Sequence, residues 1–296
     1  MNKSGRIGVV TVTYNSKPVL DQFLYSIEKQ TQDDFLVYVV DNASTDGTLA
    51  RLNTWGDTRL HVISNPVNLG FAEGTNQGIR AALADHCDHV LFLNNDVEFD
   101  IDTFEILTAE LEALHCDLLA PKILLEDRMH IWSAGGFFNV FKGYLSSHTG
   151  VGELDSGQFD ATRRIQNATA CCLLVRSTVF DAIGMMDIKY FVYHEDADFM
   201  FRAWRAGLTT FYTPRARIFH KVSSLTGGTK SPFSIRYNAR GHVYFMLKNL
   251  GVVRCLFYLP AWQLRTFVKL FTRSMSFEEF LIRQRAFFEG LSVWAS

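Results

Sequence analysis

The sequence has 296 residues, more than the usual length of one domain, so we expect one large domain with a substantial core and an appendage. Five cysteines without CxxC spacing and an N-terminus that lacks the apolar stretch of a signal peptide argue against an oxidising compartment and favour the cytoplasm. The sequence has no run of 18 apolar residues, which argues against a spanning helix. The net charge of −2 conceals an asymmetry, because residues 230–296 hold 10 Lys and Arg against 3 Asp and Glu, while residues 1–229 hold 19 against 28.

Short β-branched runs alternate with helical periodicity in the first 100 residues. Residues 7–14 and 35–41 lack polar alternation, which is typical of strands covered on both faces, and residues 18–29 have the apolar spacing of a helix. Residues 60–63 and 90–93 continue the alternation. We therefore predict an α/β protein with a Rossmann-like, mostly parallel sheet flanked by helices.

The pattern loosens after about residue 120. Residues 132–157 are rich in glycine and aromatic side chains, and we expect loops and short antiparallel strands there. The sequence then predicts a strand over 171–176, a helix over 199–206 that ends at glycine, and a final strand over 208–212.

The strand over 90–93 runs directly into Asn94, Asn95 and Asp96. In open α/β sheets, ligands bind outside the carboxyl ends of the strands. Asp96 is suited to hold Mg²⁺ or Mn²⁺ on a diphosphate, because these hard cations take one or two carboxylates plus substrate oxygens. A solvated aspartate at a strand end is the alternative.

Two further loops carry polar residues between a strand and a helix. Asp41 follows the second strand and could accept a hydrogen bond from the ring NH of a base, while Ser44 or Asp46 could cap the next helix. Residues 68–78 are glycine-rich and open a helix, so their backbone amides could face a phosphate or a sugar. Ordinary capped or glycine-bearing loops are the alternatives.

The segment before residue 199 gathers three carboxylates, Glu195, Asp196 and Asp198. Crowding should raise the pKa of at least one of them towards the range of a general base, and we choose Asp196 as that base. Asp198 is expected to cap the helix. His220 could complete a metal site through its imidazole, which suits Mn²⁺ better than Mg²⁺, although a lone histidine is more often structural.

Taken together, five segments resemble family 2 glycosyltransferases in order and spacing, and the likeness covers about residues 6–250. Within that family the chain is most similar to bacterial rhamnosyltransferase-type enzymes. The segments are Val10–Asn15, Val40–Gly47, Asn68–Gly78, Leu93–Asp96 and His194–Asp198.

The resemblance implies a GT-A fold, a nucleotide-diphosphosugar donor and inversion at the anomeric carbon. Asp196 would deprotonate the acceptor hydroxyl, and Asp96 and His220 would hold the metal. The segment Asn94–Asp96 stands where Asp-x-Asp is common in the superfamily, so it offers one carboxylate only. The donor set implied by the resemblance and by the loops above is Thr13, Tyr14, Asn15, Asp41, Asn68, Gly70, Asn76, Asn94 and Asn95, and the acceptor set is Trp132 and Glu195.

We expect residues 1–229 to form the catalytic domain, with a nucleotide-sugar half over about 1–120 and an acceptor half over about 121–229, and residues 230–296 to form a basic, aromatic helical tail. The resemblance favours transfer of L-rhamnose from dTDP-L-rhamnose to a cell-surface glycan or a lipid-linked acceptor in polysaccharide biosynthesis. A UDP-hexose donor, a catalytically inactive nucleotide-sugar-binding protein and a nucleotidyltransferase are the alternatives.

The tail carries Arg254, Arg265, Lys269 and Arg273 at spacings that superimpose on one helix face, next to aromatic residues. This pattern is typical of an interfacial helix on the inner face of an anionic membrane. Packing on the catalytic domain or on a second subunit in a homodimer is the alternative, and nucleic-acid binding is a weaker one, which we do not expect.

Overall fold

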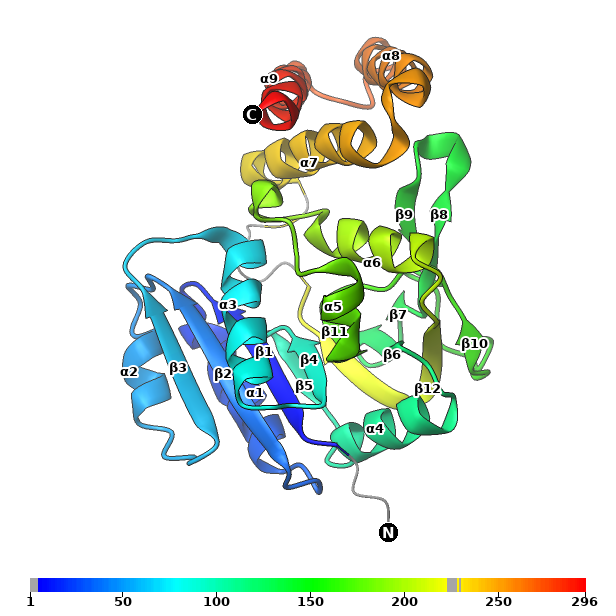
Figure 1. The fold of residues 1–296 in the computed structure, drawn as a ribbon. Coiled ribbons are helices and arrows are strands. Elements are labelled where there is room, and N and C mark those ends of the chain that lie inside the picture. Colours follow the sequence, from blue (N-terminus) through cyan, green and yellow to red (C-terminus); the bar gives the residue numbers. More distant parts are fainter. Residues whose placement is uncertain (1–4, 223–227, 229) are drawn as a thin grey trace.

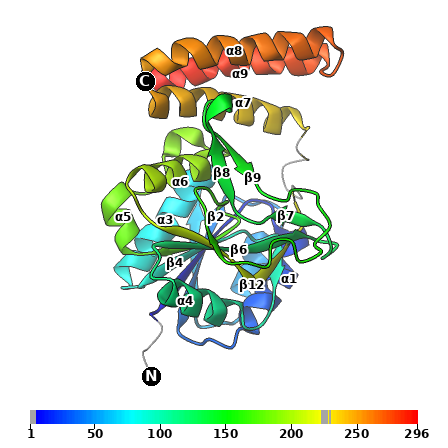
Figure 2. The same cartoon turned by 90° about the vertical axis from the view of Figure 1, so that its right-hand side faces the viewer.

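The computed structural model describes residues 5–222, 228 and 230–296. A large mixed sheet with helices packed against it forms one part of the molecule, and three long C-terminal helices stack above α6 (Figures 1 and 2). The strands are β1 (Ile7–Thr13), β2 (Phe35–Asn42), β3 (Leu60–Asn65), β4 (His89–Leu93), β5 (Val97–Phe99), β6 (Leu118–Leu125), β7 (Ile131–Ser133), β8 (Gly136–Asn139), β9 (Leu145–His148), β10 (Arg163–Arg164), β11 (Cys172–Arg176) and β12 (Thr210–His220).

The helices connect these strands and then form the tail. They are α1 (Lys17–Glu28), α2 (Thr48–Asn53), α3 (Gly70–Ala84), α4 (Thr103–Ala113), α5 (Thr178–Ile183), α6 (Glu195–Arg205), α7 (Pro232–Leu250), α8 (Val252–Phe271) and α9 (Phe277–Ala295), with short 3₁₀ turns at Val140–Lys142 and Ile188–Tyr190.

The first half of the sheet is parallel, as the sequence predicts. β1 lies between β2 and β4 and runs parallel to both, and β3 continues the series beside β2. Ile7, Val9, Val37 and Val39 are fully buried, as expected for strands covered on both faces. The carboxyl ends of β1, β2 and β4 therefore meet at one edge of the sheet.

The second half inserts antiparallel pairs into this frame. β11 runs antiparallel between β4 and β6, and β12 runs parallel to β6, which gives the order β10-β12-β6-β11-β4-β1-β2-β3. β8 and β9 form a separate antiparallel hairpin, in line with the short strands expected over 132–157. The prediction of a final strand ending at 212 is wrong, because β12 continues through an irregularity between Thr213 and Arg217 and ends at His220.

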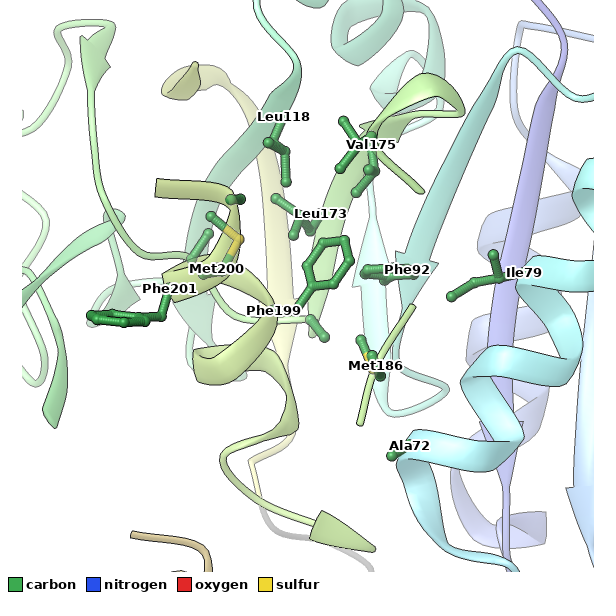
Figure 3. Packing of buried hydrophobic residues seen from close by; sticks show 14 of the residues in the cluster. Ala72, Ile79, Phe92, Leu118, Leu173, Val175, Met186, Phe199, Met200 and Phe201 are labelled. Carbon is green, nitrogen blue, oxygen red and sulfur yellow. The ribbon is translucent and has the colours of Figure 1, made fainter. Parts of the chain in front are cut away.

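The helix that we expected over 199–206 begins four residues earlier, at Glu195, and His194 occupies its N-cap position. This helix supplies part of the main core, where the Phe199 ring meets Phe92 of β4 edge to face with ring centroids 5.8 Å apart (Figure 3). Replacing such a buried phenylalanine by alanine usually costs about 3–5 kcal/mol. The apolar face of α6 thus fixes the helix against the sheet.

Asp198 joins α6 to α7 and does not cap α6, contrary to the sequence-based expectation. Its carboxylate is fully buried and accepts hydrogen bonds from Arg202 Nε, Lys248 Nζ and Asn249 Nδ2, each at 2.9 Å. Breaking a buried ion pair of this kind typically costs about 3–5 kcal/mol. The tail helix α7 is therefore anchored to the helix that carries the carboxylate cluster.

α8 and α9 pack on the far side of α7 (Figure 2). The boundary that we expect at residue 229 lies outside the described residues. None of the described helices is long and apolar enough to cross a membrane.

Candidate functional site

A pocket of about 370 Å³ opens at the carboxyl ends of β4 and β12. Asp96 lies in the turn between β4 and β5, and His220, the last residue of β12, pairs with Val97 of β5. This register brings His220 Nε2 to 3.2 Å from Asp96 Oδ1. Trp132 packs edge-on against His220, with centroids 4.7 Å apart, and both asparagines that precede Asp96 also line the pocket.

The N-terminus of α6 forms the facing wall and presents Glu195 and Asp196. Asp196 Oδ1 accepts from the amide of Ala197 at 2.7 Å, and Oδ2 is 3.4 Å from the amide of Ala170, so one oxygen is held at the helix end. Carboxylates are stabilised at helix N-termini by the helix dipole. The pocket therefore joins a carboxylate from α6 to the Asp96–His220 pair across the sheet edge.

The segment that enters α6 has an unusual backbone. Phe191, Tyr193 and His194 all have positive φ, at 66°, 63° and 71°, although none is glycine. Such conformations cost of order 1–3 kcal/mol each and cluster at functional sites. Gly241 of α7 makes room for this segment, since a Cβ there would lie 2.9 Å from the His194 ring and 3.0 Å from the carbonyl of Tyr193.

Burial and like charge act on Glu195, which is only 5% exposed. Among the described residues its Oε2 has no hydrogen-bond partner. Burial, with a further contribution from the charge of Asp196, raises the pKa of Glu195 well above its ordinary value of 4.5. The carboxylate cluster thus behaves as expected from crowding in one respect, but the raised pKa belongs to Glu195 and burial is its main cause.

The carboxylate of Asp96 and the imidazole of His220 are suitable ligands for a hard divalent cation that completes its coordination shell with oxygens from a bound diphosphate. Nowhere in the described ranges do three His, Cys, Asp or Glu side chains gather as a metal centre made by the protein alone. The buried Nδ1 of His220 has no hydrogen-bond partner within the same ranges, so the ring is held by the contact of Nε2 with Asp96 and by packing against Trp132.

The polar residues at the ends of β1 and β2 form a different kind of cluster. Asp41 is fully buried, and its carboxylate accepts from Thr13 Oγ1 at 2.8 Å, Ser44 Oγ at 2.6 Å and the Ser44 amide at 3.0 Å. Ser44 Oγ in turn accepts from the amide of Asn15. We expected the Asp41 carboxylate to bind the base of the nucleotide, but it orders the loop around it. Tyr14 beside it is half exposed.

The start of α3 is also committed to internal contacts. The amides of Phe71 and Ala72 donate to the carbonyl of Phe191, so these two amides do not face a phosphate or a sugar, and the alternative of an ordinary glycine-bearing loop describes them. Asn68 Oδ1 accepts from the Gly70 amide, and Gly70 has a φ of 85° with Phe191 O only 2.5 Å from the place of a Cβ. Asn76 is buried and binds both backbone groups of Met186, at 2.8 and 3.0 Å, away from the pocket.

Two histidines of the pocket were not singled out in the sequence. His148, at the end of β9, stacks on Trp132 with centroids 5.4 Å apart, and burial lowers its pKa despite the opposing charge of Asp196. His194 lines the pocket through its left-handed N-cap position. His148 carries no local sequence signal, because a hairpin return brings it to the site. His194 begins the segment His194–Asp198 that carries the resemblance, but the strained turn that places it in the pocket has no periodic pattern.

Comparisons with known proteins agree with the expected resemblance. The model of the family "Glycosyl transferase family 2" matches residues 8–134. The chain is 27% identical over 263 residues to the N-acetylglucosaminyl-diphospho-decaprenol L-rhamnosyltransferase of Mycobacterium tuberculosis (strain CDC 1551 / Oshkosh), covering 82% of this chain and 85% of that protein. It is 25% identical over 256 residues to the dTDP-rhamnosyl transferase RfbF of Shigella flexneri, covering 83% and 81%.

Among solved structures, the chain is similar to GalNAc-T7, determined with UDP, GalNAc and Mn²⁺, with a TM-score of 0.64 and 15% identity. The match covers 83% of this chain and about half, 48%, of that one. The GT-A-like α/β fold and the resemblance to family 2 rhamnosyltransferases are thereby confirmed.

Proposed function

We propose that this chain, a rhamnosyltransferase-like protein of the family 2 glycosyltransferase type, moves a sugar from a nucleotide-diphosphosugar to a hydroxyl of a glycan or lipid-linked acceptor, with inversion. The observation that carries the proposal is the pocket in which Asp196 faces the Asp96–His220 pair. The names of the relatives favour dTDP-L-rhamnose as the donor, with UDP-hexoses as the second candidate.

In the proposed reaction the acceptor hydroxyl attacks the anomeric carbon while the bond to the diphosphate breaks. Asp196 takes the proton of that hydroxyl, which is the one base that a single displacement needs. Asp96 and His220 would hold Mg²⁺ or Mn²⁺, which supplies neutralisation of the charge that develops on the departing diphosphate. Trp132 and Glu195 line the same pocket and would contact the acceptor, Trp132 through its apolar ring and Glu195 through a hydrogen bond from its carboxyl group.

The remaining residues of the proposed donor set contribute in two ways. Asn94 and Asn95 line the pocket. The Asn94 backbone amide donates to the carbonyl of Cys171 and Asn95 Nδ2 donates to the carbonyl of Val12, so the Asn94 side chain and Asn95 Oδ1 are the groups that we propose for the donor sugar or diphosphate. Thr13, Tyr14 and Asn15 form the base and ribose side, with Asp41 as a positioning residue below them. Because Asn76 and the first amides of α3 are engaged internally, we now propose structural roles for Asn68, Gly70 and Asn76.

The direct test is a panel of nucleotide sugars scored by thermal stabilisation and by donor hydrolysis, with and without Mn²⁺. We expect stabilisation by dTDP-L-rhamnose that depends on the cation, and slow release of dTDP. Stabilisation without any hydrolysis or transfer would instead support the inactive nucleotide-sugar-binding protein. No stabilisation by any nucleotide sugar would overturn the proposal.

We also propose that the outer face of α8 and α9 rests on an anionic membrane. Leu256, Phe257 and Phe271 of α8 and Phe288 of α9 are largely exposed, and Arg273, just after the end of α8, is exposed as well. Arg254 instead lies over the Tyr144 ring beside the β8–β9 hairpin, 5.9 Å from its centroid. The expected helix face of four cations and neighbouring aromatic residues does not point outwards as a whole. Arg265 and Lys269 line a cavity on the inner side of α8, and Trp262 stacks on Phe287. Exposed apolar groups with neighbouring cations fit an interfacial helix, and each cation near an anionic leaflet contributes about 1 kcal/mol.

Co-sedimentation with phosphatidylglycerol vesicles tests this contact. The wild type should bind at low salt and release as salt rises, and the double variant Phe257→Ser/Phe271→Ser should stay in the supernatant. Wild-type protein that ignores the vesicles contradicts the proposal. A concentration-dependent dimer that the same variant dissolves would assign the face to a second copy of the chain.

A further inference from the structure

A second cavity of about 610 Å³ lies between the tail helices and the β8–β9 hairpin. It adjoins the pocket described above, because Ser146, His194 and Asn238 line both. Residues of α8 and α9 line its far wall, and the largely exposed Phe141 lines its side. The tip of the β8–β9 hairpin rises towards the tail helices (Figures 1 and 2). A molecule that enters the first pocket can therefore extend into this cavity without leaving the protein surface.

The cavity is strongly cationic. Lys142 from the hairpin, Arg265 and Lys269 from α8 and Arg283 from α9 line it, and no Asp or Glu is among the described residues of its lining. Arg283 binds Glu279 at 2.8 Å, so it is partly neutralised, and Arg265 is 3.5 Å from the carbonyl of Phe141. The other three cations, Lys142, Arg265 and Lys269, have no carboxylate in the lining beside them, so they repel one another, and an anion bound between them would relieve that repulsion.

The base of the cavity holds an unsatisfied buried polar group. His242 of α7 is only 6% exposed, and its Nδ1 has no hydrogen-bond partner among the described residues. Burial, the neighbouring His194 and Arg265 lower the pKa of His242 to about 3, so the ring is neutral and cannot add charge. A neutral ring nitrogen can donate to or accept from a bound group, and leaving it unpaired costs free energy.

We infer that this cavity binds a phosphate or diphosphate group of the acceptor, held by Arg265, Lys269 and Lys142, while the acceptor's sugar lies in the adjoining pocket beside Asp196. The inference rests on the proposed function and specifies its acceptor as one that carries an anionic phosphate near the reacting sugar. Arg and Lys donors pair strongly with phosphate oxygens. Phe141 and Trp262 at the same cavity offer apolar contact to whatever the phosphate carries.

The first experiment measures binding without catalysis. Inorganic pyrophosphate is titrated into the full chain in the presence of EDTA, which removes divalent cations from the Asp96–His220 pair. The wild type should bind, and Arg265→Gln/Lys269→Gln should bind about 10–100-fold more weakly, as expected for loss of charged hydrogen bonds. Arg285→Gln, an exposed residue of α9 outside the lining, is the matched control and should bind like the wild type.

The second experiment compares two acceptors that end in the same sugar, N-acetylglucosamine, one linked through a diphosphate to a short prenyl chain and one an uncharged octyl glycoside. In the double variant the KM for the diphosphate acceptor should rise about 10–100-fold with kcat nearly unchanged, and the octyl glycoside should be used as by the wild type. Equal losses on both acceptors, or no pyrophosphate binding by the wild type, would overturn the inference.

These readouts separate the cavity from the proposed reaction. Pyrophosphate binding that depends on Arg265 and Lys269, with no sugar transfer to any acceptor, would leave the anion site and remove the proposed function. Sugar transfer without pyrophosphate binding at Arg265 and Lys269 would support the proposed function and rule out the anion site. Phosphatidylglycerol vesicle binding by the double variant should equal that of the wild type, and a large loss would assign the cations to bulk lipid headgroups instead of the acceptor.

Discussion

Two clusters of polar residues lie at the same edge of the sheet, and they differ in how completely they are satisfied. Around Asp41, the carboxylate takes three hydrogen bonds and is sealed from solvent. Around the pocket, Glu195 Oε2 and His220 Nδ1 are buried without partners in the described chain, and the backbone from Phe191 to His194 is strained. Unsatisfied buried groups and strain are expected where a site awaits a ligand.

The difference teaches that an aspartate at the end of a buried strand has two possible uses. The Asp41 carboxylate orders a loop through its hydrogen bonds, whereas Asp96 contacts His220 in the wall of a pocket. Changes in the first cluster should therefore act mainly on stability, and changes in the second mainly on activity.

The largest effect is expected at Asp196. Asp196→Asn keeps the shape of the side chain and its position at the helix end but removes the base, so turnover should fall by roughly 10²–10⁴-fold with donor affinity unchanged. Steady-state rates and donor titration measure the two quantities. Asp181→Asn, on the exposed side of α5, is the matched control. Near-normal turnover would move the role of the base to Glu195.

The next effect concerns the metal-binding role of the pocket cluster. Asp96→Ala should weaken donor binding in the presence of Mn²⁺ by at least about 10–100-fold, while binding in EDTA stays as in the wild type. Isothermal titration with and without the cation measures this. Asp102→Ala, at the exposed start of α4, should behave like the wild type. Undiminished cation-dependent affinity in Asp96→Ala would remove this residue from the proposed metal site.

A third change tests the closed cluster. Asp41→Asn places an amide NH₂ among the hydroxyl donors of Thr13 and Ser44, so the free energy of unfolding should fall by about 1–3 kcal/mol, measured by urea denaturation. Thr13→Val removes one donor only and should cost about 0.5–1.5 kcal/mol. Donor affinity should fall moderately in both. Full stability with a large loss of donor affinity in Asp41→Asn would mean that the carboxylate contacts the base directly.

The sequence predicts the parallel half of the fold well, because β-branched runs such as Val37–Val40 are long, apolar and separated by one amphipathic helix. It fails where local chemistry hides the element. Three carboxylates make the first turn of α6 difficult to recognise as helix, although acidic residues are favourable at a helix N-terminus. Pro214 argues against a continuous strand, but β12 accommodates this proline at the irregularity between Thr213 and Arg217.

The residues of the candidate site could be predicted in part for the same reason. Asp96 and Asp196 stand at the ends of recognisable elements, whereas His148 and His194 reach the pocket through a hairpin and a strained turn that leave no periodic pattern. The satisfied state of Asp41 depends on the Ser44 and Thr13 geometry, which spacing alone does not contain.

The smallest expected effect is a change in the pH dependence of stability at Glu195. Because burial and the charge of Asp196 raise the folded-state pKa of Glu195 above 4.5, the unfolded state loses its proton first as pH rises. The contribution of this group to stability is therefore fully present below about pH 4.5 and is lost as pH rises through the folded-state pKa.

Glu195→Gln removes the titration, so its free energy of unfolding should match the wild type near pH 4 and exceed it near pH 8, measured by urea denaturation at both values. Glu278→Gln, an exposed residue in the first turn of α9, should not give this divergence. A wild-type protein that gains stability over Glu195→Gln between pH 4 and pH 8 would mean that the buried carboxylate has an ionised state favoured by the fold, and the contrast between the two clusters would then fail at this residue.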